Sequence, residues 1–598
     1  MKKLTILAAL VGLASAKAQT VTHGPFVGAV THNSAKVWAR VLDSPTVTLE
    51  YSTSPALQNP QTAVLSVSAE NEQSGSAALS GLTPSTKYFY RIAGQTAIQS
   101  FKTLAAPGES GNYVITFGSC MNGPGRPYHT LNLIAQREPD LFLQCGDWGY
   151  PDTTDKVPQD TNFFSNDYQR VVDSYWWKYE LEEFKNLAAK VAVDYVYDDH
   201  DYVNDNASRA SSSFYDGTVF GEVPFPASAR RNSIDLYTRL FPHYDLPDTA
   251  SSLYHKIRFG NVEVFMCDNR SDRSPSLGCF RDSAGLWIYQ NPPNHHILGQ
   301  SQMNRLLNDL KNSTATWKFV MTGVSFNKGY NRAMDALSGN ANQDLDLGLI
   351  SNQVPPGTSV RSIMGALADT WAGYQADQER LLSHLQQNNI KNVVFLSSDS
   401  HTGAIDDGTN GGLPEIMAGS LGYNPNSRLA WIMDTVGQLP PAILGLLGLN
   451  SINLSVWNHG GNGLGNGYFG AAYGNIEVFG EDSCRLSLVD TLGGVFAELT
   501  LCKDAGNCQP VSRSGKPAPA EMFSLYPNPV EKEIRLRLDA SVRLLSNSYV
   551  AVYDAVGRRV LLTEYRGQSI PLGDLPAGTY HLMLKNGPTS WVKSFQKQ

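Results

Sequence analysis

An acidic run that directly follows an apolar strand constrains this chain more than any other stretch. Residues 190–197 predict a strand, and Asp198, Asp199, His200 and Asp201 continue from it without a break. Four ionisable side chains in a row are poor core material unless something positive lies among them. We therefore expect this strand end to face a bound cation.

Two other predicted strands end in the same kind of group. Each provides a carboxylate and, two or three positions later, a second side chain able to bind a metal: Asp399 with His401, and Asp147 with Tyr150. The carboxyl ends of strands are where α/β sheets place their ligands. The three strand ends therefore predict one metal centre, which we interpret as a centre that hydrolyses phosphate esters.

The segment that contains these ends alternates buried-type strands with helices. Strands at 113–117 and 141–144 flank a helix at about 131–137, and helices at about 302–311 and 378–387 each lead into another strand. A further helix is predicted from one apolar face, which we expect to pack in the core and which consists of Trp177, Leu181, Phe184 and Ala188. This order predicts a layered α/β (α+β) sandwich over residues 110–502.

Short alternating strands separated by turns flank this segment on both sides. Residues 19–105 predict a β-sandwich, and the turn with its tyrosine-rich strand at 81–91 resembles the tyrosine-corner region of fibronectin type III-like sandwiches. Residues 509–522, rich in Pro, Ser and Lys, predict a linker, and residues 523–598 predict a second β-sandwich. At 598 residues the chain is long enough for several cores.

The N-terminus has the form of a secretory signal peptide over residues 1–18. Two lysines precede an apolar run at 4–13 and a small-x-small site at 16–18. That run and the glycine-broken run at 443–449 are both too short to span a bilayer, so we expect an exported protein without a transmembrane segment. We also expect it to be a monomer. The formal net charge of −8 argues against a nucleic-acid-wrapping protein. It leaves an anionic substrate open, because a metal ion outweighs the global field locally.

Seven cysteines accompany the export signal, and export permits disulfides. Cys502 and Cys508 enclose a predicted turn and form the best pair, whereas Cys267 with Cys279 is a weaker one. An odd count leaves at least one cysteine free or bound to a metal. Cys120, at the end of the first strand of the α/β segment, is either a small apolar core residue or a thiolate ligand.

Each metal-ligand candidate has a plain structural alternative. A carboxylate and a phenolate three positions apart suit ferric iron, among other metals, but Asp147 is equally explained as the cap of a glycine turn before Tyr150. Asp399 and His401 face the same way along a strand, yet a turn aspartate with an incidental histidine explains them as well. The residues alone leave both interpretations open.

His200 and two arginines are the candidates for chemistry on the substrate. His200 would protonate the leaving-group oxygen or stabilise the pentacoordinate transition state, with a surface histidine as the alternative. Arg270 and Arg273 follow their own strand and would grip phosphate oxygens. The alternative is surface salt bridging, which we favour for Arg273. A metal-activated hydroxide would attack phosphorus in line.

Six ordered motifs are similar to those of the PhoD-like alkaline phosphatases/phosphodiesterases, within the calcineurin-like metallophosphoesterase superfamily. They lie at residues 117–120, 146–150, 197–201, 267–273, 369–374 and 397–401, and the resemblance covers about residues 20–501. It implies a ferric ion, Fe(III), with calcium ions, Ca(II), or a comparable centre with other divalent metals. The metal ligands that it implies are Cys120, Asp147, Tyr150, Asp399 and His401.

The same resemblance gives roles to the acidic run: a metal ligand for Asp199, where many relatives have an asparagine, the leaving-group histidine for His200, and a ligand or orienting carboxylate for Asp198 or Asp201. Two positions depart from the family pattern. Tyr197 stands where tryptophan is usual, and Ser398 stands where glycine is usual. The second departure leaves the backbone path beside Asp399 in question.

The last block is similar to the type A C-terminal sorting domain of type IX secretion substrates. The Tyr-Pro-Asn-Pro run at 526–529, the stretch at 575–580 and the final residues 597–598 carry this resemblance. It implies the type IX secretion machinery as a partner, with release or attachment at the cell surface. A carbohydrate-binding or adhesive β-sandwich is the alternative.

The chain is therefore predicted to be a secreted metal-dependent phosphatase for phosphomonoesters, phosphodiesters or both. The alternative is a surface adhesion or binding protein with an inactive phosphoesterase domain, which the two flanking β-sandwiches favour and the retained ligand set opposes. The natural substrate stays open, from monoesters to phospholipids and teichoic-type polymers, because the predicted lid at about 328–358 has no readable specificity.

Overall fold

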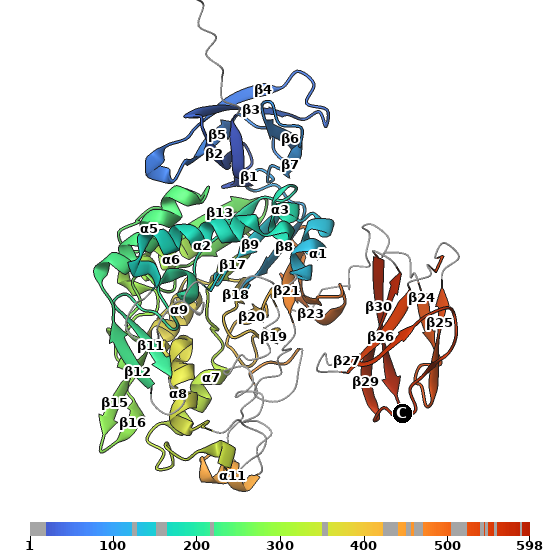
Figure 1. Cartoon of the computed structure of the whole chain (residues 1–598). Coiled ribbons are helices and arrows are strands. Elements are labelled where there is room, and N and C mark those ends of the chain that lie inside the picture. Colours follow the sequence, from blue (N-terminus) through green and yellow to red (C-terminus); the bar gives the residue numbers. More distant parts are fainter. Residues whose placement is uncertain are drawn as a thin grey trace, which may run out of the picture.

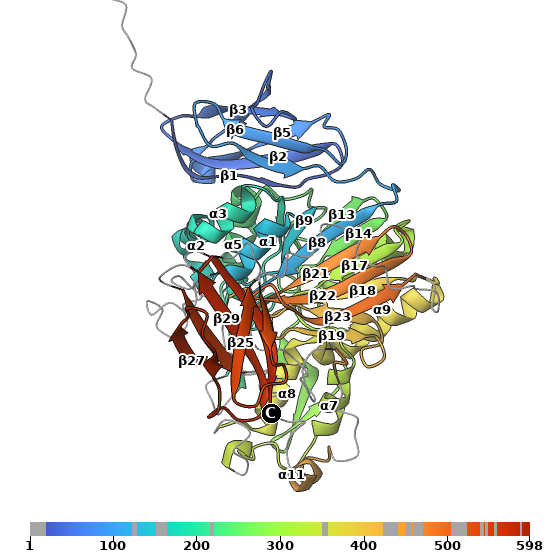
Figure 2. The same cartoon turned by 90° about the vertical axis from the view of Figure 1, so that its right-hand side faces the viewer.

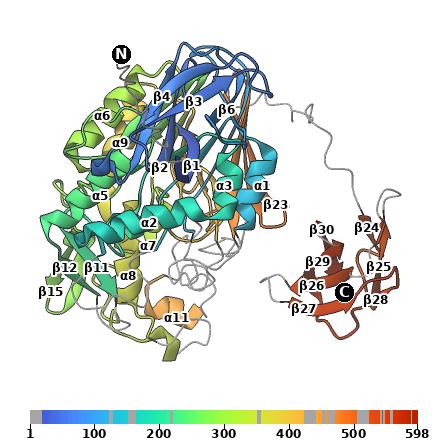
Figure 3. The same ribbon diagram turned by 45° about the horizontal axis from the view of Figure 1, so that its top comes forward.

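The computed structural model describes residues 19–121, 128–150, 164–215, 220–349, 357–422, 441–449, 456–459, 471–503, 523–538, 543–544, 548–554, 559–586 and 589–598. The predicted signal peptide and linker lie outside these residues. Figure 1 shows three parts: strands β1–β7 at one end, a large body of strands and helices, and strands β24–β30 in a group of their own. Figure 3 also shows this last group beside the body rather than within it.

The first part consists of two antiparallel sheets, ordered β1-β2-β5 and β4-β3-β6-β7. The strands are β1 Thr20–Gly28, β2 Ser34–Leu42, β3 Thr46–Ser52, β4 Gln61–Ser66, β5 Ser74–Ser80, β6 Lys87–Ile92 and β7 Gln99–Lys102. The predicted alternation is present in β3, where Val47, Leu49 and Tyr51 are buried and the residues between them are not. These side chains belong to the same hydrophobic cluster as Val37 of β2, so the two sheets share one core.

The body contains two six-stranded sheets, ordered β10-β9-β8-β21-β22-β23 and β13-β14-β17-β18-β20-β19. Strands β8, β9 and β10 run parallel, and so do β14, β17, β18 and β20. Side chains such as Phe117 and Leu143 in the first sheet and Met266 and Leu396 in the second belong to one cluster. The sheets therefore pack face to face, as Figure 2 shows.

The strands of these two sheets are β8 Asn112–Gly118, β9 Leu141–Gln144, β10 Val193–Tyr195, β13 His255–Phe259, β14 Val262–Met266, β17 Trp317–Met321, β18 Val393–Ser397, β19 Ala404–Asp407, β20 Pro414–Met417, β21 Ala472–Phe479, β22 Ser483–Asp490 and β23 Val495–Cys502. Two hairpins lie outside the sheets: β11 Ser211–Tyr215 with β12 Phe220–Pro224, and β15 Phe280–Ser283 with β16 Leu286–Tyr289.

Helices cover the outer faces of both sheets. The described helices of the body are α1 His129–Arg137, α2 Tyr168–Glu180, α3 Glu182–Ala188, α4 Asp199–Tyr202, α5 Ala227–Leu240, α6 Gly299–Asn312, α7 Gly329–Leu337, α8 Val360–Asp369, α9 Gln375–Gln387 and α11 Pro441–Leu446. Phe142 and Val193 of the first sheet pack with α1, α2, α3 and α5. Phe265 and Phe395 of the second sheet pack with α6 and α9. The order helix, sheet, sheet, helix confirms the predicted mixed α/β fold.

The prediction of one continuous helix through residues 177–188 is wrong. α2 ends at Glu180 and α3 begins at Glu182, and Leu181 between them has a ψ angle of 124°. Phe184 and Ala188 are nevertheless buried. Apolar spacing did not reveal the break because no glycine or proline marks it. The predicted face is buried only in α3, whereas α2 buries Tyr175 and Tyr179 on another face and leaves Trp177 half-buried.

The weaker predicted disulfide is also wrong, because Cys267 and Cys279 are both free and buried. Cys502 is disulfide-bonded, and Cys508, its predicted partner, lies outside the described residues. None of the described helices combines the length and the apolar character that a bilayer crossing needs.

The C-terminal strands have a hydrophobic core of their own, to which Val550, Leu582 and Phe595 belong. They form sheets ordered β24-β25-β28 and β27-β26-β29-β30. The strands are β24 Phe523–Tyr526, β25 Glu533–Leu538, β26 Tyr549–Asp554, β27 Arg559–Glu564, β28 Ile570–Pro571, β29 Gly578–Asn586 and β30 Thr589–Lys597.

Aromatic side chains join the first part to the body. The rings of Phe26 in β1 and Trp38 in β2 each lie 4.9 Å, centroid to centroid, from the ring of Tyr179 in α2. Phe26 also packs against Phe184 and Phe241. All five side chains are buried, so the first part and the body are joined by shared core packing.

This packing predicts that Trp38→Ala destabilises the body as well as β1–β7. Loss of a buried tryptophan leaves a cavity, and we expect the free energy of unfolding to fall by about 3–5 kcal/mol. Urea unfolding should remain a single transition for both parts. Val64→Ala, at a side chain that is 64% exposed, is the control. A separate early transition of β1–β7 in the Trp38 variant would contradict the shared core.

Candidate metal centre

Strand ends from both facing sheets meet at one edge of the body. β8 leads to Cys120, β9 to Asp147, and β18 to Asp399 and His401. The φ angles of these four residues are 55°, 53°, 60° and 51°, in the left-handed region that residues other than glycine rarely adopt. Such outliers gather at functional sites, because the surrounding structure must hold them in place.

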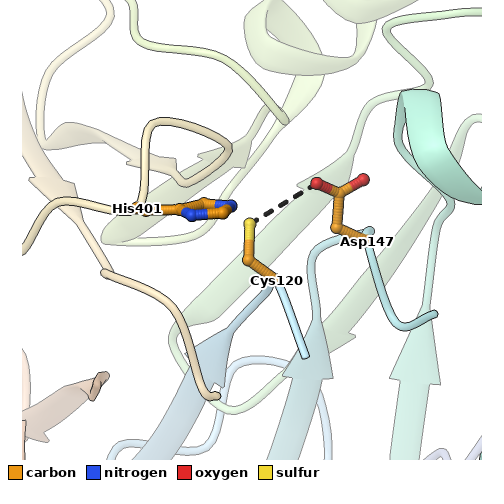
Figure 4. Close-up of side chains that lie close together, drawn as sticks. All are labelled: Cys120, Asp147 and His401. Carbon is orange, nitrogen blue, oxygen red and sulfur yellow. Dashed lines mark hydrogen bonds between the residues drawn. The ribbon is translucent and has the colours of Figure 1, made fainter. Parts of the chain in front are cut away.

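The first cluster combines a thiol, a carboxylate, a phenol and an imidazole. The Tyr150 hydroxyl oxygen lies 2.9 Å from Asp147 Oδ2 and 3.0 Å from His401 Nε2. Cys120 Sγ lies 3.5 Å from the same Asp147 oxygen. Figure 4 shows Cys120, Asp147 and His401 gathered around one point from separate strand ends. Donor atoms this close together suit a single metal ion.

A second group shares Asp147 with the short helix α4. Ligand atoms lie within 4.8 Å of one another in two further sets: Asp147 with Asp199 and His200, and Asp198 with Asp199 and Asp399. The His200 backbone N–H donates to Asp147 Oδ1 over 3.3 Å. The His200 ring packs on that of Tyr150 with 4.3 Å between centroids. One Asp147 oxygen thus faces the first cluster and the other faces α4.

Arg270 lies among the carboxylates of the second group. Its guanidinium is fully buried, and it donates to Asp198 through Nε and to Asp369 through Nη1, the latter over 3.2 Å. Its Nη2 has no hydrogen-bond partner among the described residues. This nitrogen lies 3.6 Å from an Asp199 oxygen and 3.7 Å from an Asp399 oxygen. The set of Asp198, Asp199 and Asp399 therefore already contains one cation.

Arg273 is buried as well, so the surface salt bridge that we favoured for it is wrong. Its Nη2 lies 2.8 Å from Asp369 Oδ1, and its Nε donates to the Tyr374 hydroxyl over 2.7 Å. This ion pair lies in the core. Asp369, the first residue of the motif at 369–374, pairs with both Arg270 and Arg273.

Buried negative charge exceeds buried positive charge at this edge. The buried Asp198, Asp199 and Asp369 and the partly exposed Asp399 lie around the two arginines, and the buried Asp147 lies beside Asp199. Burial, followed by neighbouring carboxylates, raises the pKa of Asp147 and Asp399 well above the usual range. Burial opposes ionisation of Asp199 too, but Arg270 and His200 hold its pKa below the usual value. Such an excess of buried carboxylates fits bound cations.

Asp201 lies apart from these donor groups. Its two oxygens accept the backbone N–H groups of Trp148 and Gly149 over 3.1 and 3.2 Å. Lys178 Nζ lies 2.7 Å from Asp201 Oδ1. Among the described residues, the sets of candidate metal donors do not include Asp201. Its contacts are those of a group that orients the backbone between Asp147 and Tyr150.

Three residues around the site were missed from the sequence. Asp369 belongs to a motif that carried the resemblance but had no assigned role. Gly323 matters because a Cβ atom there would lie 2.3 Å from Asp198 Oδ2. Lys178 gave no signal, since a lysine in a helix is normally solvated and this one is 1% exposed.

Three stretches of the chain match known protein families. Residues 115–427 match the model of the PhoD-like phosphatase family. Residues 8–105 match that of the PhoD-like phosphatase N-terminal domain, and residues 524–598 that of a secretion system C-terminal sorting domain. Alkaline phosphatase D of Bacillus subtilis (strain 168) is 25% identical over 341 residues, which cover 54% of this chain and 52% of that protein. The match thus spans about half of that relative's length.

A solved structure of PhoD shows the same fold. A structure of PhoD superposes with a TM-score of 0.57 at 17% sequence identity, covering 80% of this chain and 90% of that one. A purple acid phosphatase from yellow lupin (Lupinus luteus) seeds reaches a TM-score of 0.47 at 12% identity, covering 80% and 74%.

The close approach at Gly323 predicts that Gly323→Ala disturbs the centre. The added methyl group would push the Asp198 carboxylate off Arg270, and overpacking of this kind lowers the free energy of unfolding by about 1–3 kcal/mol. Chemical denaturation checks the stability, and elemental analysis of the purified variant checks the metal content. Wild-type values in both measurements would show that Asp198 has room to move.

Proposed function

Because the chain belongs to the PhoD-like phosphatase family, we propose that it hydrolyses phosphate esters at a metal centre on this edge. The observation that carries the proposal is the first cluster, in which buried donor atoms of Cys120, Asp147, Tyr150 and His401 meet from three strand ends. The mixture of thiol, phenol, carboxylate and imidazole has no evident structural purpose without a metal.

The first cluster would hold a ferric ion. Hard anionic oxygens with a thiolate and an imidazole form a donor set that an Fe(III) ion can use, with other transition metals as competitors. Burial and the Asp147 charge raise the pKa of both the Cys120 thiol and the Tyr150 phenol well above their usual values. Metal binding would therefore release protons from these groups.

The second group would hold a harder cation such as Ca(II), for which carboxylate oxygens are the preferred ligands. Asp147 would bridge the two ions, and Asp199 and Asp399 would complete the oxygen set, with Asp198 beside them. Asp399 and His200 have side chains that are 18% and 17% exposed, whereas Asp147 and Asp199 are buried. The substrate would approach from this partly open side.

When bound, the metal ions supply positive charge that polarises the phosphoryl oxygens and acidifies a water molecule. His200 is placed to hand a proton to the leaving-group oxygen, since its ring rests on Tyr150 and its Nε2 lies 3.9 Å from Asp205 Oδ1. Arg270 Nη2 would contact a phosphoryl oxygen, because it is the guanidinium nitrogen that Asp198 and Asp369 leave without a hydrogen bond.

The parts that flank the catalytic body would serve export and act as a scaffold. We infer that residues 1–18 are a signal peptide, that β1–β7 form a fibronectin III-like β-sandwich, and that the C-terminal β-sandwich addresses a monomeric enzyme to the type IX secretion machinery. The match of residues 524–598 to a secretion sorting domain supports release or attachment at the cell surface.

A surface adhesion or binding protein with an inactive phosphoesterase domain is the competing function. It would need no transition metal, so metal analysis of carefully purified protein separates the two. Rates on p-nitrophenyl phosphate and on its bis-ester, measured with the metals in the same sample, would also rank monoesterase against diesterase activity.

Asp147→Asn is predicted to abolish hydrolysis while the protein stays folded. Asparagine keeps the shape but removes the charge that both groups share, and loss of an interaction made at the reacting centre lowers turnover by several orders of magnitude. Hydrolysis of both nitrophenyl esters and circular dichroism are the measurements. Asp245→Asn, at a fully exposed carboxylate, is the matched control. Turnover of either ester by the Asp147 variant at the wild-type rate would reject the bridging role.

Removal of residues 509–598, which keeps Cys508, is predicted to leave a folded, active enzyme that is no longer exported. The C-terminal strands have their own core, and the candidate site lies wholly in the body. Expression of both forms in a bacterium with type IX secretion, followed by fractionation and phosphatase assay, tests this. Equal export of the truncated form would contradict the sorting role.

A further inference from the structure

Lys178 in α2 is a buried cation to which no role has been assigned. Its Nζ lies 2.7 Å from Asp201 Oδ1 and 3.2 Å from the Tyr195 hydroxyl. The rings of Tyr175, Tyr195 and Trp148 lie 4.7, 5.1 and 5.8 Å from the same nitrogen. Ammonium groups are strongly hydrated, so a lysine enclosed by aromatic rings is kept in place by its carboxylate partner and by cation–π attraction.

Asp201 passes the effect of this charge to the backbone of the loop at 146–150. Its carboxylate accepts hydrogen bonds from the backbone N–H groups of Trp148 and Gly149. These two residues stand directly between Asp147 and Tyr150, the carboxylate and the phenol of the first cluster. Because Asp201 holds these two successive peptide units, it restrains the separation of the Asp147 and Tyr150 side chains.

The same contact ties the loop to α4. Asp201 lies in the short helix that also carries Asp199 and His200. One turn of helix therefore directs two residues toward the candidate metals and one toward the loop that follows β9. The distance between the two ligand-bearing segments depends on this carboxylate.

Close packing restricts the position of the loop at 146–150. A Cβ atom on Gly149 would lie 3.3 Å from Lys178 Cε and 3.2 Å from the Trp177 ring. Trp148 is fully buried and packs edge to face on Phe184 and Tyr195, with centroids 4.8 and 5.1 Å apart. The loop thus rests on the lysine stem, with its tryptophan held in the aromatic core.

We propose that Lys178 and Asp201 form a positioning pair that holds the 146–150 loop so that Asp147 and Tyr150 bind the same metal ion. The proposal rests on the proposed function, since it concerns the metals that function requires. Without Lys178 the buried Asp201 charge would have no cation, and water or a turned carboxylate would compete with the two amides. Partners that orient metal ligands in this way typically change metal affinity by about 10–100-fold.

The test compares two buried lysines. Lys178→Met keeps the length of the side chain and removes its charge. The control is Lys318→Met, at a buried lysine of β17 whose Nζ donates to the Ala315 and Lys391 carbonyls over 2.7 and 3.3 Å. Proteins are loaded with Fe(III) and Ca(II), and the rate of metal loss to a chelator is followed beside urea unfolding.

We expect both variants to lose stability and only Lys178→Met to lose metal faster, by at least about 10-fold. The double variant Lys178→Met, Asp201→Asn removes the unpaired charge and should regain stability. It should still lose metal quickly, because an amide side chain offers one acceptor oxygen to two N–H groups. This variant keeps the test valid where Lys178→Met alone fails to fold.

Metal loss at the wild-type rate from folded Lys178→Met or from the double variant would overturn the positioning role. Equal acceleration in Lys318→Met would also overturn it, because general destabilisation would then explain the effect. A wild-type protein that holds no metal overturns the proposed function itself, which distinguishes that failure from a failure of the pair.

Discussion

Buried carboxylates outnumber buried cations at the strand ends that form the candidate site. Four buried aspartates and the partly exposed Asp399 lie at one edge with two buried arginines, and unpaired charges are expensive to remove from water. Arg270 balances the carboxylates behind the site, leaving Asp147 and Asp399 with raised pKa values. The remaining excess of negative charge lies beside the thiol, phenol and imidazole of the first cluster. The residues that a bound cation would stabilise are therefore also the residues that can bind it.

The fold supplies the rigidity that such a site requires. Two sheets pack face to face, and their parallel strands end at the same edge with helices on the outer faces. Cys120, Asp147, Asp399 and His401 can therefore stay in left-handed backbone conformations, since each follows a strand whose other end is fixed in a core. The first part of the chain also adds rigidity, because Phe26 and Trp38 pack on the aromatic residues that enclose Trp148.

The sequence predicted the strands and the convergence of their ends more fully than it predicted the interior of the site. Apolar runs bounded by turns located β8 and β9 to within a residue, because burial on both faces leaves a continuous pattern. The burial of Arg273 and Lys178 could not be foreseen, because it depends on contacts with Asp369 and Asp201 from distant segments. The break at Leu181 was missed because the spacing of Trp177, Leu181, Phe184 and Ala188 imitates one helical face, although only the part in α3 is that helix's buried face.

Ser398, which stands where glycine is usual, helps to show which positions of the site require glycine. Ser398 is not among the described residues with positive φ, and its hydroxyl donates to the Gly323 and Cys145 carbonyls over 3.1 and 3.4 Å. The backbone beside Asp399 thus needs no glycine, and the side chain adds a link between the two sheets. Glycine is needed on the facing loops instead: a Cβ atom on Gly146 would lie 2.4 Å from Asp198 Cβ, and one on Gly323 would meet the Asp198 carboxylate. The two loops therefore approach the site most closely at Asp198, which forms an ion pair with Arg270. We conclude that the need to bring Asp198 to Arg270, rather than the spacing of the metal ligands, sets the distance between the strand ends.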